Sequence, residues 1–324
     1  MLHMETTSET AIVRSSSSLP ANVGTQYAND SDAYLVGMFL RDRKPNTVKK
    51  YTRDLESFFR FLSGRSYRDV RTDDLQQWAA SLSGAAKSVH ERIATVRSFY
   101  AWSAKLGAVS LNPAAMLKNP TVRERIAERV LSPEERERII AAAATQRDYA
   151  ILQFLFASGA RVSELCALRK KDVRFKTSDG SVVVNIWREK TEDYTSQAYS
   201  AASGIPALLR LLVDGRDDES YVFRSTGVPS RIASRAGQNA DGKLDTTAVW
   251  RIVRAAAKRA GINKHVSPHW FRHSCATQLI ETAELTKVAE WLGHRNIQTT
   301  VRYIHIAGGL DLSSHLPAVP AFSR

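Results

Sequence analysis

One arginine of this sequence follows a glycine at a spacing that suits the binding of a phosphate. Gly159 permits a tight turn, Arg161 follows at a predicted loop-to-helix junction, and Glu164 lies one helical turn later on the same face. A guanidinium at such a junction presents its fork of N–H groups to a phosphate, and the carboxylate one turn on holds the guanidinium. An Arg–Glu pair on a helix is also common as a surface salt bridge, so this motif alone leaves both interpretations open.

A second candidate group lies at the start of a predicted helix. Ser267 is a good N-cap and Pro268 suits the first turn, so we expect a helix to begin there. His269 and Arg272 are then three residues apart on one face, close to backbone N–H groups that favour an anion. The alternative is a capped helix on which the histidine and the arginine have no shared role.

Two further residues near the C-terminus complete the set. Gly293 is expected to end a helix, so that His294 enters the following loop, and Tyr303 follows in the next segment. A lone tyrosine is usually a packing residue with a tethered hydroxyl. A tyrosine beside two arginines and two histidines is different, because the cations lower the cost of its phenolate form and stabilise a pentacovalent phosphorane.

The order and spacing of these motifs resemble the signature of the tyrosine recombinases, which are the phage-type integrases. The matching motifs are Arg161-x-x-Glu164, His269-x-x-Arg272, Leu292-Gly293-His294 and Tyr303. The resemblance covers residues 29–303 and implies a mainly α fold. It implies an N-terminal SAM-like helical core-binding domain, then a linker, and then a mixed α/β catalytic domain with helices around a small antiparallel β-sheet.

The resemblance also implies a role for each residue. Tyr303 attacks a scissile DNA phosphate and forms a 3′-phosphotyrosyl link, which leaves a free 5′-hydroxyl. Arg161 and Arg272 hold the non-bridging oxygens, and His294 is a further donor. His269 serves in proton transfer at the nucleophile. Neither a metal nor another cofactor is implied, because the arginines supply the positive charge that ions provide in two-metal nucleases.

One lysine, Lys190, matches the family's general acid for the leaving 5′-oxygen, in the turn between the second and third expected strands. This turn departs from the family, in which such turns are rich in basic residues and glycine. Here Glu189, Glu192 and Asp193 surround the lysine. These carboxylates either orient the ammonium or repel DNA, and the alternative is a surface lysine whose role is filled elsewhere.

Composition and charge agree with a polyanionic partner. The chain has 324 residues, with 46 Lys and Arg against 33 Asp and Glu, for a net charge of +13. Basic residues exceed acidic ones by four within residues 41–60 and by eight within 224–302, so each predicted domain carries a basic region. A solvated helix face is the alternative for either region alone. The DNA-binding candidates in these regions are Arg43, Lys44, Lys49, Lys50, Arg53, Arg231, Arg235 and Lys243.

Composition also excludes several classes of protein. A hydrophobic fraction of 43% excludes global disorder, and two cysteines argue against a disulfide framework or a cysteine-rich zinc site. No apolar run approaches the roughly 20 residues that span a bilayer, and the N-terminus lacks the apolar core of a signal peptide. We therefore expect a cytoplasmic, nucleoid-associated protein with no membrane partner.

Apolar periodicity predicts the elements that position these motifs. In the first domain, Asn46 is expected to cap a helix that runs to Leu62. In the second, Ser132 caps a new helix, and residues 173–175 and 182–187 form a β-hairpin with a third strand at 195–200. The expected divisions of the chain are a disordered tail at 1–28, a helical core-binding domain at 29–117, a linker at 118–130 and a catalytic domain at 131–324.

Two other functions share parts of this pattern. A type IB topoisomerase uses the same chemistry but relaxes supercoils as a monomer without a defined site, and the helical N-terminal domain favours the recombinase. A recombinase fold could also serve as a non-catalytic DNA-binding or architectural protein, although every motif residue is present. The expected partner is a double-stranded DNA target site, on which the protein forms a homotetramer or a heterotetramer with a paralogue.

Overall fold

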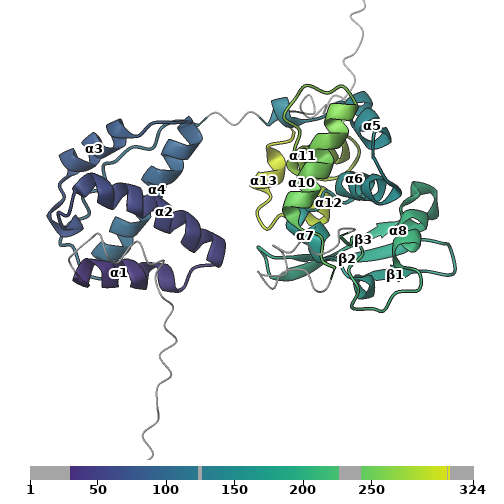
Figure 1. Ribbon diagram of the computed structural model, residues 1–324, viewed down its shortest axis with the longest axis horizontal. Helices are drawn as coiled ribbons and strands as arrows, with labels where there is room; N and C mark the ends of the chain where they lie inside the picture. The colour runs from purple at the N-terminus through teal and green to yellow at the C-terminus, as the bar shows by residue number, and fades with distance from the viewer. Residues whose placement is uncertain (1–29, 123–125, 226–241, 305, 307–324) are drawn as a thin grey trace, which may run out of the picture. The chain divides into compact units, whose positions relative to one another are not determined.

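The computed structural model describes residues 30–122, 126–225, 242–304 and 306. Contacts divide the chain into two compact units, residues 1–124 and 125–324 (Figure 1). The predicted tail and the DNA-binding candidates Arg231 and Arg235 lie outside the described residues.

The first unit is a group of helices around an aromatic core. The ring of Phe58 lies 5.1 Å from that of Trp78, and the ring of Phe39 lies 5.3 Å from that of Phe99, both edge to face. Such pairs contribute beyond the apolar area that they bury. The helices described in this unit are α1 (Asp30–Arg41), α2 (Pro45–Leu62), α3 (Thr72–Ser81) and α4 (Ala86–Lys105).

Helix α2 begins one residue before its predicted cap. Lys44 occupies the N-cap position and Pro45 lies in the first turn, where the missing N–H of proline leaves no bond unmade. Asn46 therefore lies inside the helix, and the prediction that it caps the helix was wrong. The predicted end at Leu62 is confirmed, since Ser63 follows in the left-handed region with a φ of 52°.

The second unit combines helices with one small sheet, which lies with α8 at one end of the unit in Figure 1. Ser132 and Glu135 form the capping box that starts its first helix, as Ser132 was predicted to do. The helices described in this unit are α5 (Pro133–Ala141), α6 (Gln146–Ser158), α7 (Val162–Ala167), α8 (Ile205–Val213), α10 (Thr246–Arg259), α11 (Pro268–Thr282), α12 (Leu285–Leu292) and α13 (Gln298–Val301).

The sheet is antiparallel, with its strands in the order β1 (Val173–Phe175), β2 (Val182–Arg188) and β3 (Asp193–Tyr199). Val173 pairs with Val184, and Arg188 pairs with Asp193 at the end of the second hairpin. The inward face of β2 is buried at alternate positions, as the period of a strand requires. Four residues make up that face: Val182, Val184, Ile186 and Arg188.

The predicted fold class is therefore confirmed: a helical first unit, and a mainly helical second unit with a three-stranded antiparallel sheet. In the described part of the chain, no helix has the length and apolar character needed to cross a membrane.

Candidate active site

Arg161 lies at the junction of two helices. Helix α6 ends at Ser158, and Gly159 follows in the left-handed region with a φ of 56°. A Cβ on Gly159 would lie 2.6 Å from Cδ2 of Leu292, so backbone and packing both require glycine. Arg161 is the N-cap residue of α7 and donates to both oxygens of Glu164, from its backbone N–H (2.8 Å) and from Nη1 (2.7 Å). The Arg161 side chain remains 22% exposed.

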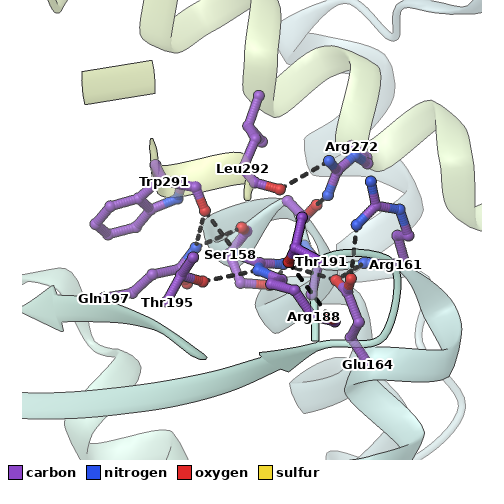
Figure 2. A network of polar contacts seen from close by, with 12 residues as sticks. Ser158, Arg161, Glu164, Arg188, Thr191, Thr195, Gln197, Arg272, Trp291 and Leu292 are labelled. Atoms are coloured by element: carbon purple, nitrogen blue, oxygen red, sulfur yellow. Dashed lines mark hydrogen bonds and ion pairs between the residues drawn. The ribbon is translucent and has the colours of Figure 1, made fainter. Parts of the chain in front are cut away.

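Arg272 is buried among main-chain carbonyls. From α11, its Nη1 donates to the carbonyl of Gly159 (2.5 Å) and its Nη2 to the carbonyl of Leu292 (2.8 Å), which joins the ends of α6 and α12. Figure 2 shows its guanidinium beside that of Arg161. Burial, and then the charge of Arg161, lower the pKa of Arg272 to about 10, so it stays protonated at neutral pH. Two neighbouring cations form a site that favours an anion.

His294 follows the glycine that ends α12. Gly293 has a φ of 65°, and the Nδ1 atom of His294 lies 2.8 Å from the hydroxyl of Thr300. Burial, and then Arg272 and Arg161, lower the pKa of His294 to about 3. The ring is therefore neutral at neutral pH. When the Thr300 hydroxyl donates to Nδ1, the Nε2–H of the ring is left as a donor.

Tyr303 is buried in the same unit. The residue is only 4% exposed, and its hydroxyl lies 2.7 Å from Nδ1 of His273. Burial raises the pKa of Tyr303, while Arg272 and Arg302 act in the opposite direction without offsetting it. The cations therefore act to lower the pKa of the tyrosine, as predicted, but burial raises this pKa by more.

His273 is the partner of the tyrosine hydroxyl, and it is neutral. Burial, and then the charge of His269, lower the pKa of His273 to about 4. A neutral imidazole has one unprotonated nitrogen, so Nδ1 is able to accept the hydrogen of the Tyr303 hydroxyl.

Comparison with known proteins decides the family. The model of the phage integrase family matches residues 129–308, a range that includes every residue of the predicted catalytic set. The model of the phage integrase N-terminal SAM-like domain matches residues 32–107. The chain belongs to the phage integrase family. The resemblance inferred from the motifs is confirmed.

Relatives of this integrase-family chain include several bacterial recombinases. The tyrosine recombinase XerC of Xanthomonas campestris pv. campestris (strain B100) is 30% identical over 277 residues, which cover 82% of this chain and 80% of that protein. XerC of Mycobacterium bovis (strain BCG / Pasteur 1173P2) is 32% identical over 280 residues, which cover 82% and 89%.

Solved integrase structures share the fold. A lambda integrase dimer bound to a COC′ core site has a TM-score of 0.66 at 18% identity, over 84% of this chain and 75% of that chain. The XerH site-specific recombinase in a post-cleavage complex with palindromic difH substrate has a TM-score of 0.65 at 17% identity, over 87% of each chain.

Two residues of the predicted integrase catalytic set are exposed. Lys190 lies in the turn between β2 and β3, and His269 lies in the first turn of α11. Arg161, Arg272, His294 and Tyr303 are buried or half-buried. In the described part of the chain, no group of three or more His, Cys, Asp or Glu side chains could hold a metal ion.

Sequence reasoning missed two residues that the structure places in this candidate site, His273 and Arg188. His273 follows Arg272 directly, so the signal was its place one helical turn after His269. Arg188 is fully buried, and its Nη1 lies 2.6 Å from Oε2 of Glu164. Its signal was an arginine on the inward, otherwise apolar face of a strand.

The DNA-binding candidates of the first unit differ in what they contact. Arg43 lies over the ring of Phe39 at 4.2 Å, and Lys50 donates to the buried carboxylate of Asp54 at 3.2 Å. These two side chains therefore support the first unit itself. In the second unit, the ammonium of Lys243 lies over the ring of Tyr221. The candidates that the structure leaves exposed are Lys44, Lys49, Arg53 and Lys243.

Proposed function

We propose that this chain is a site-specific DNA recombinase that cuts and rejoins strands through a 3′-phosphotyrosyl intermediate. One observation carries the proposal. Tyr303, the residue of the set suited to be the nucleophile, is close enough to the adjacent cations Arg272 and Arg161 for their charges to act on its pKa. Membership of the phage integrase family supports it.

The reaction is a transesterification. The hydroxyl oxygen of Tyr303 forms a bond to phosphorus as its proton passes to the imidazole of His269, and the bond from phosphorus to the 5′-oxygen breaks as Lys190 gives that oxygen a proton. Arg161 and Arg272 stabilise the added negative charge on the non-bridging oxygens of the phosphorane. Because the phosphotyrosyl ester conserves the energy of the bond, an incoming 5′-hydroxyl is able to reverse the step on the same strand or on a partner strand.

The remaining residues handle hydrogen bonds and protons. His294, with Thr300 at its Nδ1, offers a neutral N–H donor to a non-bridging oxygen. Lys190 protonates the leaving 5′-oxygen, and His269 serves in proton transfer at the nucleophile. For Lys190, an exposed turn beside the site supports the role, since an acid that meets a leaving group on DNA has to be accessible.

The partner in this proposal is a double-stranded DNA target site, bound in the cytoplasm by a homotetramer or by a heterotetramer with a paralogue. The exposed basic residues Lys44, Lys49, Arg53 and Lys243 contact the phosphate backbone. A solved structure with a TM-score of 0.64 and 17% identity, covering 82% of this chain and 77% of that one, is a lambda integrase tetramer bound to a Holliday junction.

The decisive experiment traps the covalent complex. Nicked duplexes tiled across the DNA that flanks the gene are incubated with the protein, and adducts are resolved on a denaturing gel. We expect an adduct with the wild-type protein and none with Tyr303→Phe, although that variant should bind the same duplex equally well, since it lacks only the attacking oxygen.

The other outcomes identify the competing functions. An adduct that persists in Tyr303→Phe refutes the assignment of the nucleophile. Relaxation of a supercoiled plasmid that carries none of the trapped sites indicates a topoisomerase. Binding without any adduct from the wild-type protein indicates an architectural protein.

A further inference from the structure

Arg188 is a fully buried arginine at the end of β2, two residues before Lys190. Its guanidinium makes three contacts, each with a different segment. Nη1 donates to Oε2 of Glu164 at 2.6 Å, Nη2 donates to the carbonyl of Trp291 at 2.7 Å, and Nε donates to the hydroxyl of Thr195 at 2.7 Å. Figure 2 shows this group at the centre of the network.

The first contact joins Arg188 to the phosphate-binding arginine. Glu164 receives Arg188 on Oε2 and Arg161 on Oε1, so one carboxylate holds both guanidinium groups. Burial acts to raise the pKa of Glu164, but Arg188 and Arg161 outweigh it and the pKa is lowered. The carboxylate is therefore ionised at neutral pH and fixes the distance between β2 and α7.

The second contact joins Arg188 to the end of α12. The carbonyl of Trp291 is one of the carbonyls that the end of a helix leaves without an intrahelical donor. A Cβ on Gly293 would lie 2.6 Å from Nε of Arg188, so the backbone before His294 runs directly along the arginine side chain. The position of His294 is thus tied to that of Arg188.

The backbone of Arg188 closes the turn that carries Lys190. Its carbonyl accepts the N–H groups of Thr191 at 3.1 Å and Glu192 at 2.8 Å, and Glu192 has a φ of 54°. The side chain of Arg188 anchors this residue to α7 and α12, and the main chain of the same residue sets the turn.

We propose that Arg188 is a positioning residue that fixes the Lys190 turn relative to Arg161 and His294. It does not touch the reacting atoms. It holds the proposed general acid at a fixed position relative to the phosphate pocket. The inference rests on the proposed function, in which Lys190 is the acid and Arg161 a phosphate ligand. Lysine does not replace it, because one ammonium lacks the three separate nitrogen donors of the guanidinium.

Kinetics on two substrates test the proposal. The first is a nicked duplex that gives an adduct with the wild-type protein, and the second is the same duplex with a 5′-bridging sulfur, which leaves without a proton. We expect Arg188→Met to slow adduct formation about 100-fold on the first, in line with the cost of a misplacement of about 1 Å. On the sulfur substrate, the deficit should shrink at least tenfold, as it should for Lys190→Ala.

Matched variants separate this role from general stability. Arg169→Met changes another arginine of the same unit, one that donates to the carbonyl of Glu219 and to the hydroxyl of Tyr221. This variant should keep the wild-type adduct rate. Arg188→Lys keeps the charge and should fall between the wild-type protein and Arg188→Met. It carries the same test if Arg188→Met fails to fold. The dissociation constant for the duplex should stay within threefold of wild type in each folded variant.

A second measurement needs no substrate. Trypsin should cut after Lys190 at least fivefold faster in Arg188→Met than in the wild-type protein, while its rate after Lys176, in the β1–β2 turn, should not change. Mass spectrometry of the fragments reports both rates. A merely structural role would accelerate both cuts together.

Each outcome is decisive. Three results would overturn the proposal. The first is an unchanged adduct rate in Arg188→Met, and the second is equal acceleration of both tryptic cuts. The third is a deficit of Arg188→Met that is equal on both substrates although the sulfur substrate rescues Lys190→Ala. If Lys190→Ala is not rescued by the sulfur substrate, the role of Lys190 as the acid fails, and the tryptic comparison alone decides whether Arg188 fixes the turn. Absence of any adduct from the wild-type protein overturns the proposed function.

Discussion

Two histidines of the site, His273 and His294, are held neutral by burial and by nearby positive charge. Their pKa values of about 4 and about 3 lie below the ordinary value of 6.5. Each has its Nδ1 atom beside a hydroxyl, that of Tyr303 or that of Thr300. At the pH of the cell, both rings therefore act as neutral hydrogen-bonding groups rather than as additional cations.

The contact between His273 and Tyr303 predicts a loss of rate on substitution. His273→Leu removes the partner of the hydroxyl, and we expect adduct formation to slow about 2- to 10-fold, the equivalent of one hydrogen bond. His273→Asn should lose less, because its side chain places a polar atom near the position of Nδ1. Single-turnover trapping on the nicked duplex measures both, with the exposed His265 changed to Leu as the control. A wild-type rate in His273→Leu would refute the role.

The same pKa shifts predict the pH dependence of stability. At His273 and His294, the unfolded chain takes up protons as the pH falls below 6.5, whereas the folded protein takes them up only near pH 4 or below, so the free energy of unfolding decreases over that interval. The loss at pH 5 is at most about 2 kcal/mol per histidine, and contact of these half-buried rings with water reduces it.

Urea unfolding at pH 7.5, 6.5 and 5.5 measures this dependence. His294→Asn should show a shallower decrease than the wild-type protein, whereas Lys176→Ala, which changes an exposed side chain and no histidine, should keep the wild-type slope. Equal slopes in all three proteins would contradict the shift assigned to His294.

Helix ends are the elements that build this site. Arg161 is the N-cap residue of α7, Arg272 binds the carbonyls of Gly159 and Leu292, and Arg188 binds that of Trp291. The ends of α6 and α12 leave carbonyls without intrahelical donors, and the two buried arginines, together with Gln197 of β3, supply these donors. The same contacts that complete the helices therefore orient the guanidinium groups.

Glycine is needed at the end of α12 for two reasons, its left-handed backbone conformation and its close contact with Arg188. Substitutions at two glycines separate these reasons. Gly293→Ala combines a left-handed φ of 65° with a Cβ only 2.6 Å from Nε of Arg188, whereas Gly215→Ala has a φ of 70° and open space around the new Cβ. We expect about 1 kcal/mol of destabilisation for Gly215→Ala and about 1–3 kcal/mol more for Gly293→Ala. Thermal unfolding measures both, and equal losses would show that the contact with Arg188 is unimportant.

In the proposed function, the positive charge of the chain has two uses: some arginines bind the scissile phosphate, and exposed basic residues of each unit contact the DNA backbone. The proposed phosphate ligands are two arginines of the second unit, Arg161 and Arg272, whereas the exposed candidates for backbone contacts lie in both units. Contacts between the exposed basic residues and DNA phosphates release counterions, so the affinity for DNA should fall steeply as the salt concentration rises.

A single lysine tests this division. Lys49→Ala should weaken binding of the trapped duplex and reduce the slope of log Kobs against log salt by about 0.9, the value for one phosphate contact. Its effect on the adduct rate at saturating protein should be small. Lys176→Ala, an exposed lysine outside both basic regions, should leave the slope unchanged. An unchanged slope in Lys49→Ala would remove this residue from the DNA-binding surface.

Local signals in the sequence were sufficient for most elements. The capping residue Ser132, the turn before β2 and the glycine that ends α12 were all predicted from residue type and spacing. The start of α2 was misplaced because Pro45 and Asn46 both suit a helix start, and proline occupies the first turn. Arg188 was missed because an arginine is rarely buried, although its place on an otherwise apolar strand face was a signal.

The sequence by itself determined the family and most of the elements, and it predicted the reacting groups and their order, since these depend on residue type and short spacing. Only the tertiary structure decided which groups from distant segments of the chain are in contact. Glu164 binds Arg188 across 24 positions of the chain, and Arg272 binds Gly159 across 113. Protonation states follow from the same contacts, because burial and charges from distant segments set the pKa of each buried group.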